Sequence, residues 1–458
     1  MSMKSMLTTS VLCLVMSHAG QASAQETVMS LSELYEQADR QSQQLRVNRT
    51  GVESAQEQVK SAKSNMLPDV NLSLSGSYIG NAMLLSRGFS SSGYTTIPYA
   101  VGVGQAKNGK QDTPHWGNSF ALQVSEVLYA GGAIRAGIRM AELGEQMSSL
   151  DVKKNEQEVR FLLTGYYLDL FKLQNQLQVI DKNIGLTEQV LKNMRARRQE
   201  GTVLKNDITR YELQLQSLEL SKTQLKDASS IINHQLVTTL HLPSTMVIRT
   251  DTTELESEYG TLADVANEDE WQQRASDGNA GLKQASLQTD LAKQQVKLSK
   301  AEMRPSIAVV AEEHLNGPYT NDLIPVNANV NAWFVGVGIK YNLGSIWRKN
   351  HGVKRAHLNE RQSREQLTLA QEGINNAVQA SYTNFLTSHT EVETQQKQVE
   401  LADQNYSVVK NRYENELALL TDMLDASNMK LSAEMALVNA RIGLLYNYYK
   451  LKYITNSL

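Results

Sequence analysis

Apolar residues recur every three or four positions over a long stretch in the first half of the chain. They are spaced alternately by four and three residues, the heptad pattern of a helix that packs along one face. The positions are Val159, Leu163, Tyr166, Leu170, Leu173, Leu177, Ile180, Ile184, Thr187, Leu191 and Met194. A polar break containing Gly201 follows, and the apolar stripe resumes at Ile208. The pattern predicts two long helices joined by a tight turn.

The same pattern returns 215 residues later in the chain. The corresponding positions run from Ile374 to Val409 in the same heptad phase, with smaller side chains at several of them. The turn repeats too. Residues 412–423 contain an arginine, then an acidic residue at the end of the first helix, then the apolar residues that begin the next helix, as residues 197–208 do. A shared turn at one offset favours an internal duplication over coincidence.

Shorter segments alternate between apolar and polar residues with a period of two. In the first of them Val70, Leu72 and Leu74 alternate with polar side chains. A helix cannot place such a pattern on one face, so these segments are predicted to be strands. The predicted strands are 69–79, 118–129, 306–315 and 332–342, of which 306–315 alternates least clearly. Glycines at Gly131, Gly132 and Gly344 mark the predicted strand-to-helix turns.

We therefore expect two structural repeats, each running helix, strand, loop, strand, long helix, turn, helix. The predicted division is 25–242 for the first repeat with its hairpin tip near 199–206, 243–270 for a linker, and 271–458 for the second repeat with its tip near 414–421. Residues 31–66, rich in Ala, Gln, Glu and Lys, are predicted to form one helix, and the linker is predicted to be irregular with one short strand.

The first residues predict export. Lys4, an apolar run from Met6 to Met16 and the small-residue site Ala22-Ser23-Ala24 have the order of a secretory signal peptide over residues 1–24. A membrane-spanning helix is the alternative, but the run is about half of the ~20 residues it needs. Cys13, the only cysteine, lies in this segment. A net charge of −3 with mixed signs along the chain argues against a nucleic-acid partner.

The strands raise a problem of closure. Strands of roughly ten residues can cross a membrane when tilted, but four of them cannot form a closed sheet. An open edge in lipid leaves unpaired backbone groups at a cost of several kcal/mol each. The chain is therefore expected to oligomerise. Tyr129, Trp333 and Tyr341 near strand ends would suit an aromatic girdle in the bilayer, with ordinary core packing as the alternative.

The doubled plan, the strand end Leu128–Gly132, the tip Arg197–Asp207 and the segment Thr421–Ser427 resemble the outer-membrane efflux, or TolC-type channel-tunnel, family. The resemblance implies a mainly α fold with membrane β-structure. Three chains would share a 12-stranded β-barrel, four strands each, continued by a long coiled-coil α-helical barrel. It implies that the protein is a homotrimer in the lipid bilayer of the outer membrane, with its helical tunnel in the periplasm. The implied partners are a periplasmic adaptor and an inner-membrane RND, ABC or MFS pump.

By the same resemblance, Asp422 and Asp425 correspond to a pore gate. They lie three residues apart and so share a helix face. In a trimer they would form carboxylate rings that favour cations, and no metal site is expected beyond weak cation binding there. The alternative is a pair of solvated acids at a helix start, favoured by the helix dipole.

The resemblance also implies contacts that close the tip and a surface that docks the adaptor. The closing contacts are Asp207 and Tyr413, while the arginine expected with them is replaced by Ala418. The glycine usual in the second turn is replaced by Glu416. The adaptor-docking residues are Gly201, Thr202, Val203, Glu416 and Leu417.

Nothing in the sequence suggests an enzyme or a cofactor. The histidines are scattered, and neither a His-Glu-x-x-His nor a Gly-x-Ser-x-Gly motif occurs. We predict a passive outer-membrane duct of a tripartite efflux system that exports small molecules. The exit duct of a type I protein secretion system is one alternative, and a secreted coiled-coil scaffold or adhesin is another.

Overall fold

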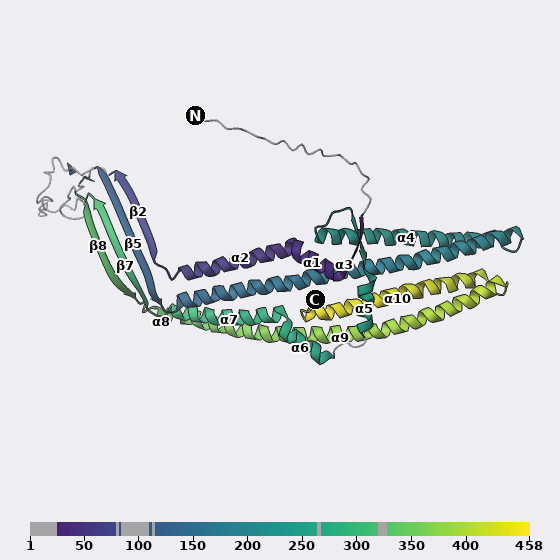
Figure 1. Cartoon of the computed structure of the whole chain (residues 1–458). Helices are drawn as coiled ribbons and strands as arrows, with labels where there is room; N and C mark the ends of the chain where they lie inside the picture. Colours follow the sequence, from purple (N-terminus) through teal and green to yellow (C-terminus); the bar gives the residue numbers. More distant parts are fainter. Residues whose placement is uncertain (1–24, 79–81, 84–109, 112–114, 263–266, 319–327) are drawn as a thin grey trace, which may run out of the picture. The chain divides into compact units, whose positions relative to one another are not determined.

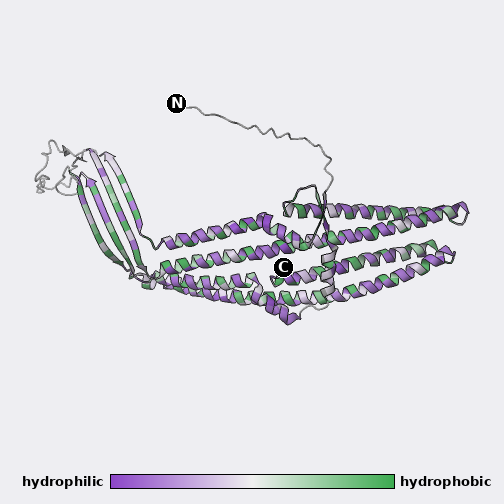
Figure 2. Cartoon of the chain, in the orientation of Figure 1, coloured by the Kyte–Doolittle hydropathy of each residue, from purple (hydrophilic) through white to green (hydrophobic). Residues whose placement is uncertain are grey.

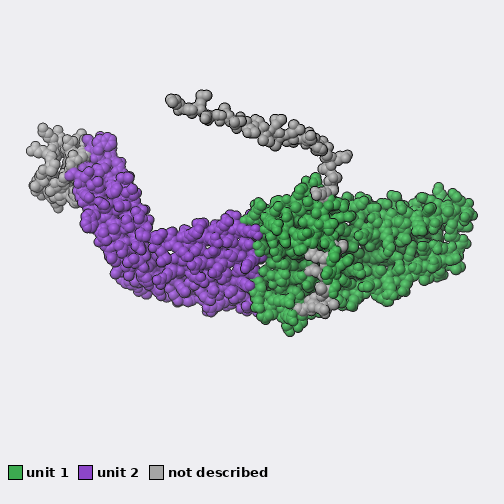
Figure 3. Space-filling view, viewed as in Figure 1, with its two compact units in different colours: residues 1–46, 154–279, 374–458 green, residues 47–153, 280–373 purple. Residues whose placement is uncertain are grey.

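The computed structural model describes residues 25–78, 82–83, 110–111, 115–262, 267–318 and 328–458, so the predicted signal peptide lies outside the described residues. The chain divides into two compact units (Figure 3). Unit 1 comprises residues 1–46, 154–279 and 374–458, and unit 2 comprises residues 47–153 and 280–373. Each unit draws on both halves of the sequence, so the compact units do not coincide with the predicted repeats.

Unit 2 contains an antiparallel sheet of four strands in the order β2-β5-β7-β8 (Figure 1). The strands are β2 Asp69–Tyr78, β5 Trp116–Ala130, β7 Ser306–Gly317 and β8 Val330–Lys340, and each overlaps one predicted strand. The central pairing of β5 with β7 joins the two halves of the sequence. A separate pairing joins the two-residue strands β3 Ala82–Met83 and β4 Lys110–Gln111.

The outer strands of this sheet expose apolar side chains and a free edge. Within the described residues β2 pairs only with β5, and β8 pairs only with β7. Leu74 of β2 is 72% exposed and Ile339 of β8 is 71% exposed. The alternation of apolar and polar residues along the strands is visible in Figure 2. Free edges of this kind present unpaired backbone groups to any further strand.

The helices of unit 2 begin at sharp turns beyond the strands. Gly131, between β5 and α3 (Ala133–Gln199), has a φ of 65°, and a Cβ there would lie 2.5 Å from the Ala301 carbonyl oxygen. Gly132 has a φ of 98°. Both positions therefore favour glycine. Gly344, their counterpart in the second half, has an ordinary helical φ of −64°, so its conformation is open to other residues.

Unit 2 is completed by helices that flank the strands in the chain. These are α2 Gln43–Ser64 from residue 47 onward, α7 Ala280–Ala301, α8 Ser345–Arg348 and the first part of α9 Asn350–Glu414. None of the described helices combines the length and apolar character needed to cross a lipid bilayer.

Unit 1 contains both helical hairpins, α3 with α4 (Lys205–Thr239) and α9 with α10 (Leu420–Ile454). The heptad positions predicted from the sequence are largely buried. In α3, Leu163, Leu170 and Met194 are at most 1% exposed. In α9 the equivalent Val378 and Phe385 are also buried, which agrees with the shared heptad phase.

Two features of unit 1 differ from the sequence prediction. The single helix expected over residues 31–66 is two helices, α1 Leu31–Gln41 and α2, separated at Ser42, whose ψ of 123° is not helical. The linker, expected to be irregular with one short strand, contains such a strand, β6 Met246–Thr250, but also the unexpected helix α5 Thr252–Thr261 and the start of α6 Glu268–Gly278. Strand β6 pairs in parallel with β1 Gln25–Met29, a pairing across more than 200 residues that local periodicity cannot reveal.

Candidate functional site

The two hairpin turns of unit 1 lie at the same end of the hairpins and have the same backbone geometry (Figure 1). In the first, the amide of Thr202 donates to the Arg197 carbonyl at 3.1 Å and that of Gly201 to the Arg198 carbonyl at 3.0 Å. In the second, the amide of Leu417 donates to the Arg412 carbonyl at 2.7 Å and the amide of Glu416 to the Tyr413 carbonyl at 3.0 Å. Both are Schellman motifs, which terminate a helix through one left-handed residue.

Glu416 occupies the left-handed position of the second turn, where the first turn has Gly201. Its φ is 63°, against 82° for Gly201. This conformation costs a residue with a Cβ roughly 1–2 kcal/mol relative to glycine. The departure from glycine noted in the sequence therefore strains the backbone without changing the turn.

The side chain of Glu416 reaches across to the other hairpin. Its Oε1 accepts a hydrogen bond from Nη2 of Arg197 at 2.8 Å, which is also an ion pair. The Arg197 side chain is 27% exposed and the Glu416 side chain 68% exposed, so solvent screens the pair and its contribution is at most about 1 kcal/mol. Arg412, the counterpart of Arg197, instead donates to the Leu417 carbonyl of its own turn at 3.2 Å.

Beneath this ion pair an apolar cluster joins the two hairpins. Its buried members are Leu191, Met194, Ile208, Tyr211 and Leu420, with Val203, Leu424 and Tyr413 packed against them. All four long helices, α3, α4, α9 and α10, contribute to it. The ends of the hairpins are therefore held together mainly by apolar burial, with the exposed ion pair above it.

Three tyrosines in this region are shielded from solvent. Burial raises the pKa of Tyr413, while the charge of Arg197 lowers it and that of Asp207 raises it. Burial also raises the pKa values of Tyr211 and Tyr406. The hydroxyl of Tyr211 is buried without a hydrogen-bond partner among the described residues. All three therefore stay protonated well above neutral pH.

Asp207 and Tyr413, the predicted closing contacts, lie near each other without a direct hydrogen bond in the described structure. Asp207 is in the first turn of α4 and is partly exposed. The residue that links the two turns is Arg197, which the sequence placed in the first turn without a partner. The sequence signal that could have revealed the pair is an acid at the glycine position of the second turn, opposite an arginine in the first.

Asp422 and Asp425 are both exposed, whereas Met423 and Ala426 in the same stretch of α10 are buried. The Asp422 carboxylate accepts a hydrogen bond from the Leu419 amide at 3.1 Å, as an acid in the first turn of a helix does. This contact accounts for Asp422 locally but leaves Asp425 unexplained. Within the described part of the chain, no cluster of three or more His, Cys, Asp or Glu side chains is arranged to hold a metal ion.

Farther along the hairpins, polar side chains link the helices. Lys430 of α10 pairs with Asp403 of α9 and lies 5.0 Å from the centre of the Tyr406 ring. Its side chain is only 11% exposed, so the carboxylate neutralises a nearly buried cation. Between the hairpins, the Glu434 carboxylate accepts from Asn183 at 3.1 Å and from Lys182 at 3.4 Å.

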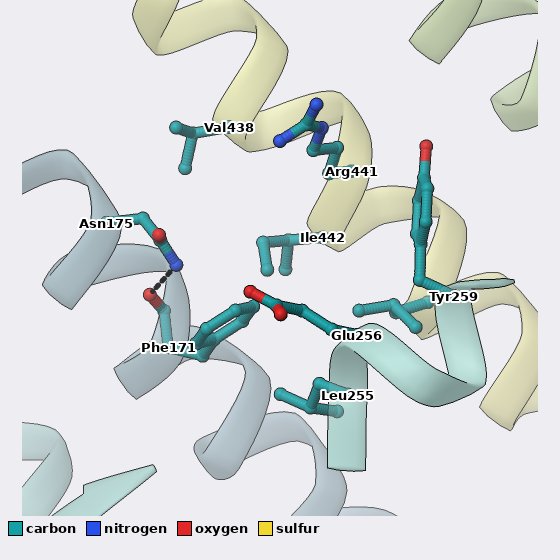
Figure 4. A pocket seen from close by; sticks show the side chains of 9 residues that line it. Phe171, Asn175, Leu255, Glu256, Tyr259, Val438, Arg441 and Ile442 are labelled. Atoms are coloured by element: carbon teal, nitrogen blue, oxygen red, sulfur yellow. Dashed lines mark hydrogen bonds between the residues drawn. The ribbon is translucent and has the colours of Figure 1, made fainter. Parts of the chain in front are cut away.

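Unit 1 also contains a small cavity of about 290 Å³ between α3, α5 and α10 (Figure 4). Leu255, Tyr259 and Ile442 give it apolar walls, and Glu256 and Arg441 also line it. Asn175 Nδ2 donates to the Phe171 carbonyl at 2.8 Å along one wall. Within the described structure no hydrogen bond joins Glu256 to Arg441, and the lining offers no nucleophile paired with a base.

The sequence matches the model of a family described as outer membrane efflux protein over residues 34–240 and 271–457. The match covers most of the chain and is interrupted only by the segment that includes β6 and α5. The chain belongs to the outer membrane efflux protein family. Members of this family are outer-membrane channel proteins rather than enzymes. As a member, this protein is an outer-membrane channel protein without catalytic activity.

Relatives of this efflux family protein support the assignment across its length. It is 21% identical to the outer membrane protein TolC of Salmonella enteritidis over 439 residues, which is 94% of this chain and 82% of TolC. Its fold is similar to the outer membrane protein VceC of Vibrio cholerae, with a TM-score of 0.71, 15% identity and coverage of 93% of this chain and 96% of that chain. It is also similar to CusC, with a TM-score of 0.74, 14% identity and coverage of 93% and 91%.

Proposed function

We propose that this efflux family protein is the outer-membrane duct of a tripartite efflux system, assembled as a homotrimer. The twelve strands of three chains would form one closed barrel, and the hairpins would form a tunnel in the periplasm. A periplasmic adaptor would dock at the hairpin turns, and an inner-membrane pump would deliver small molecules for export.

The observation that carries the proposal is the unsatisfied sheet of unit 2. Both outer strands have a free edge in the described structure and expose apolar side chains, such as Leu72 at 59% and Val337 at 68%. A sheet placed in a bilayer must pair all its backbone groups, so β2 of one chain would pair with β8 of the next. The internal β5–β7 pairing already repeats this arrangement between the two halves of the chain.

The hairpin turns support the remainder of the proposal. Gly201, Thr202, Val203 and Leu417 form compact turns, of which only Val203 is partly covered, so the first-turn and second-turn residues are accessible to an adaptor. Asp422 and Asp425 would face the axis of the trimer as the narrowest part of the pore. Tyr129, Trp333 and Tyr341, which are 41%, 74% and 42% exposed, would contact the bilayer interface.

The test uses the full-length protein expressed in a bacterium that lacks its own outer-membrane efflux channel, together with a periplasmic adaptor and an inner-membrane pump. We expect a detergent-extracted trimer that conducts ions in planar bilayers and lowers the accumulation of a fluorescent efflux dye. A monomer that stays in solution without detergent would refute the duct. A conducting trimer that leaves dye accumulation unchanged but restores export of a type I protein substrate would assign it to protein secretion instead.

A further inference from the structure

A basic groove occurs in unit 2 where the strands meet the helices. It encloses about 640 Å³ and is lined by Arg135 and Arg139 of α3, by Lys297 and Lys300 of α7, and by Arg304 in the turn that precedes β7. The remaining lining residues are glycine, alanine and glutamine, so the groove has five basic side chains and no acidic one. The Ala130–Ser306 pairing brings the ends of β5 and β7 together at this level (Figure 1).

Two of the five basic side chains already have partners within the fold. Arg304 donates to the Gly131 carbonyl at 3.1 Å, and Arg139 pairs with Glu142 at 3.1 Å. The other three, Arg135, Lys297 and Lys300, are exposed and have no ion-pair partner among the described residues. Cations that converge on a concave surface without carboxylates create a local positive potential that attracts an anion.

An exposed apolar surface adjoins this groove and shares two of its residues. A second groove of about 260 Å³ is lined by apolar Met66, Leu128, Tyr129 and Ile134 and by one acidic residue, Glu126. It includes Gly132 and Arg135 of the basic groove. Met66 is 55% exposed and Leu128 is 59% exposed. A positive site continuous with an exposed apolar surface matches a ligand that has an anionic head and a hydrocarbon tail.

We propose that the groove formed by Arg135, Lys297 and Lys300 binds the phosphate headgroup of an anionic phospholipid, whose acyl chains lie against Met66, Leu128 and Tyr129. The inference rests on the proposed outer-membrane duct, in which the strand ends would lie at the headgroup level of the periplasmic leaflet. A lone phosphate would be attracted to the cations but would leave the apolar surface uncovered. The bound lipid would fix the depth of the sheet in the bilayer.

The test compares three forms of the full-length protein purified in detergent. One is the wild type, one is the groove variant R135Q/K297Q/K300Q, and one is the control K153Q/K192Q/K283Q, which removes three exposed lysines outside the groove. Native mass spectrometry measures binding of phosphatidylglycerol, of phosphatidylcholine with the same acyl chains, and of inorganic phosphate. The wild type and control should prefer phosphatidylglycerol at least tenfold. Three basic contacts near the headgroup correspond to a loss of about 100-fold in the groove variant.

The inference is overturned if the wild type binds the two lipids equally, or if the groove variant binds phosphatidylglycerol as the control does. It is also overturned if inorganic phosphate binds in a groove-dependent manner while phosphatidylglycerol does not, because the site would then take a free anion. Trimer mass and bilayer conductance are measured on the same samples. A conducting trimer without lipid preference refutes only the lipid site, whereas a soluble monomer refutes the duct itself.

Discussion

Glu416 shows how one residue can strain a turn and still connect it to a neighbour. Its left-handed conformation costs roughly 1–2 kcal/mol, while its exposed pair with Arg197 returns at most about 1 kcal/mol. Stability alone therefore does not account for a glutamate at this position. A contact between the two hairpin turns does.

We predict that Glu416→Gly leaves the protein as stable as the wild type or about 1 kcal/mol more stable, because relief of backbone strain outweighs loss of the screened ion pair. Glu416→Ala loses the pair and keeps the strain, so it should be the least stable of the three. Thermal unfolding in detergent gives the order. An alanine variant as stable as the glycine variant would show that the turn is not strained.

The same ion pair should affect conduction. Arg197→Gln removes the link between the turns without relieving any strain, so ion conductance in planar bilayers should rise if the contact holds the tip closed. Arg195→Gln, which breaks an ion pair with Glu212 inside the first hairpin, is the matched control. Equal conductance in both variants and the wild type would show that Arg197 does not help to hold the tip closed.

Tyr211 provides a second prediction for a single residue. Its buried hydroxyl has no partner among the described residues, so Tyr211→Phe should be neutral or stabilise the protein by about 1 kcal/mol. Tyr167→Phe is the matched control, because that hydroxyl donates to the Met29 carbonyl and accepts from the Asp251 amide, each at 2.9 Å. The control should lose about 1–3 kcal/mol. Equal losses in thermal unfolding would mean that Tyr211 has a partner after all.

Among the elements, α9 and α10 are joined by a nearly buried cation. Lys430 lowers the pKa of Asp403 below its usual value of 3.8 through a hydrogen bond and its charge. Because the folded-state pKa is lowered, the pair stabilises the protein above pH 3.8 and loses this effect as the pH falls through the lowered pKa. Asp403 is 56% exposed, so screening limits the contribution to about 1 kcal/mol.

We therefore predict that Asp403→Asn destabilises the second hairpin by about 1 kcal/mol at neutral pH, and that the difference from the wild type shrinks below pH 3.8. Lys430→Met removes the buried charge together with the pair, so its stability relative to the wild type should rise by about 1 kcal/mol as the pH falls through the lowered pKa of Asp403. Circular dichroism melts over a pH series measure both effects. A difference in stability between Asp403→Asn and the wild type that does not change with pH would show that the substitution acts through packing rather than charge.

The duplication is visible in the elements, but the two copies use their turns differently. Gly131 must be glycine because of its conformation and the nearby Ala301 carbonyl, whereas Gly344 has an ordinary helical conformation. The hairpin turns differ in the same way at Gly201 and Glu416. Equivalent sequence positions thus keep the backbone path while their side-chain requirements diverge.

In the whole molecule, Asp422 and Asp425 would combine into rings only when three chains assemble. We predict that Asp422→Asn with Asp425→Asn weakens cation selectivity of the pore, because six carboxylates would be lost from its narrowest part. The reversal potential in a salt gradient across a planar bilayer measures this selectivity. Asp227→Asn with Glu219→Gln is the matched control on α4. Cation selectivity equal to that of the control would show that both aspartates are only solvated acids at the start of a helix.

The sequence alone determined the helices and strands, because a period of 3.5 or of two residues is a local property that decides which face is buried. It also indicated both hairpin turns and the family, while the gating role of Asp422 and Asp425 stays a prediction. The break at Ser42 escaped it because the helix-favouring composition of residues 31–66 carries no signal for a change of ψ at one residue.

Only the tertiary structure decided which distant residues meet. The β5–β7 pairing, the parallel β1–β6 pairing, the Arg197–Glu416 link and the basic groove of Arg135, Lys297 and Lys300 each join segments more than 150 residues apart. Such contacts depend on how long helices and strands are aligned after they form. Side-chain periodicity within one segment contains no information about that alignment.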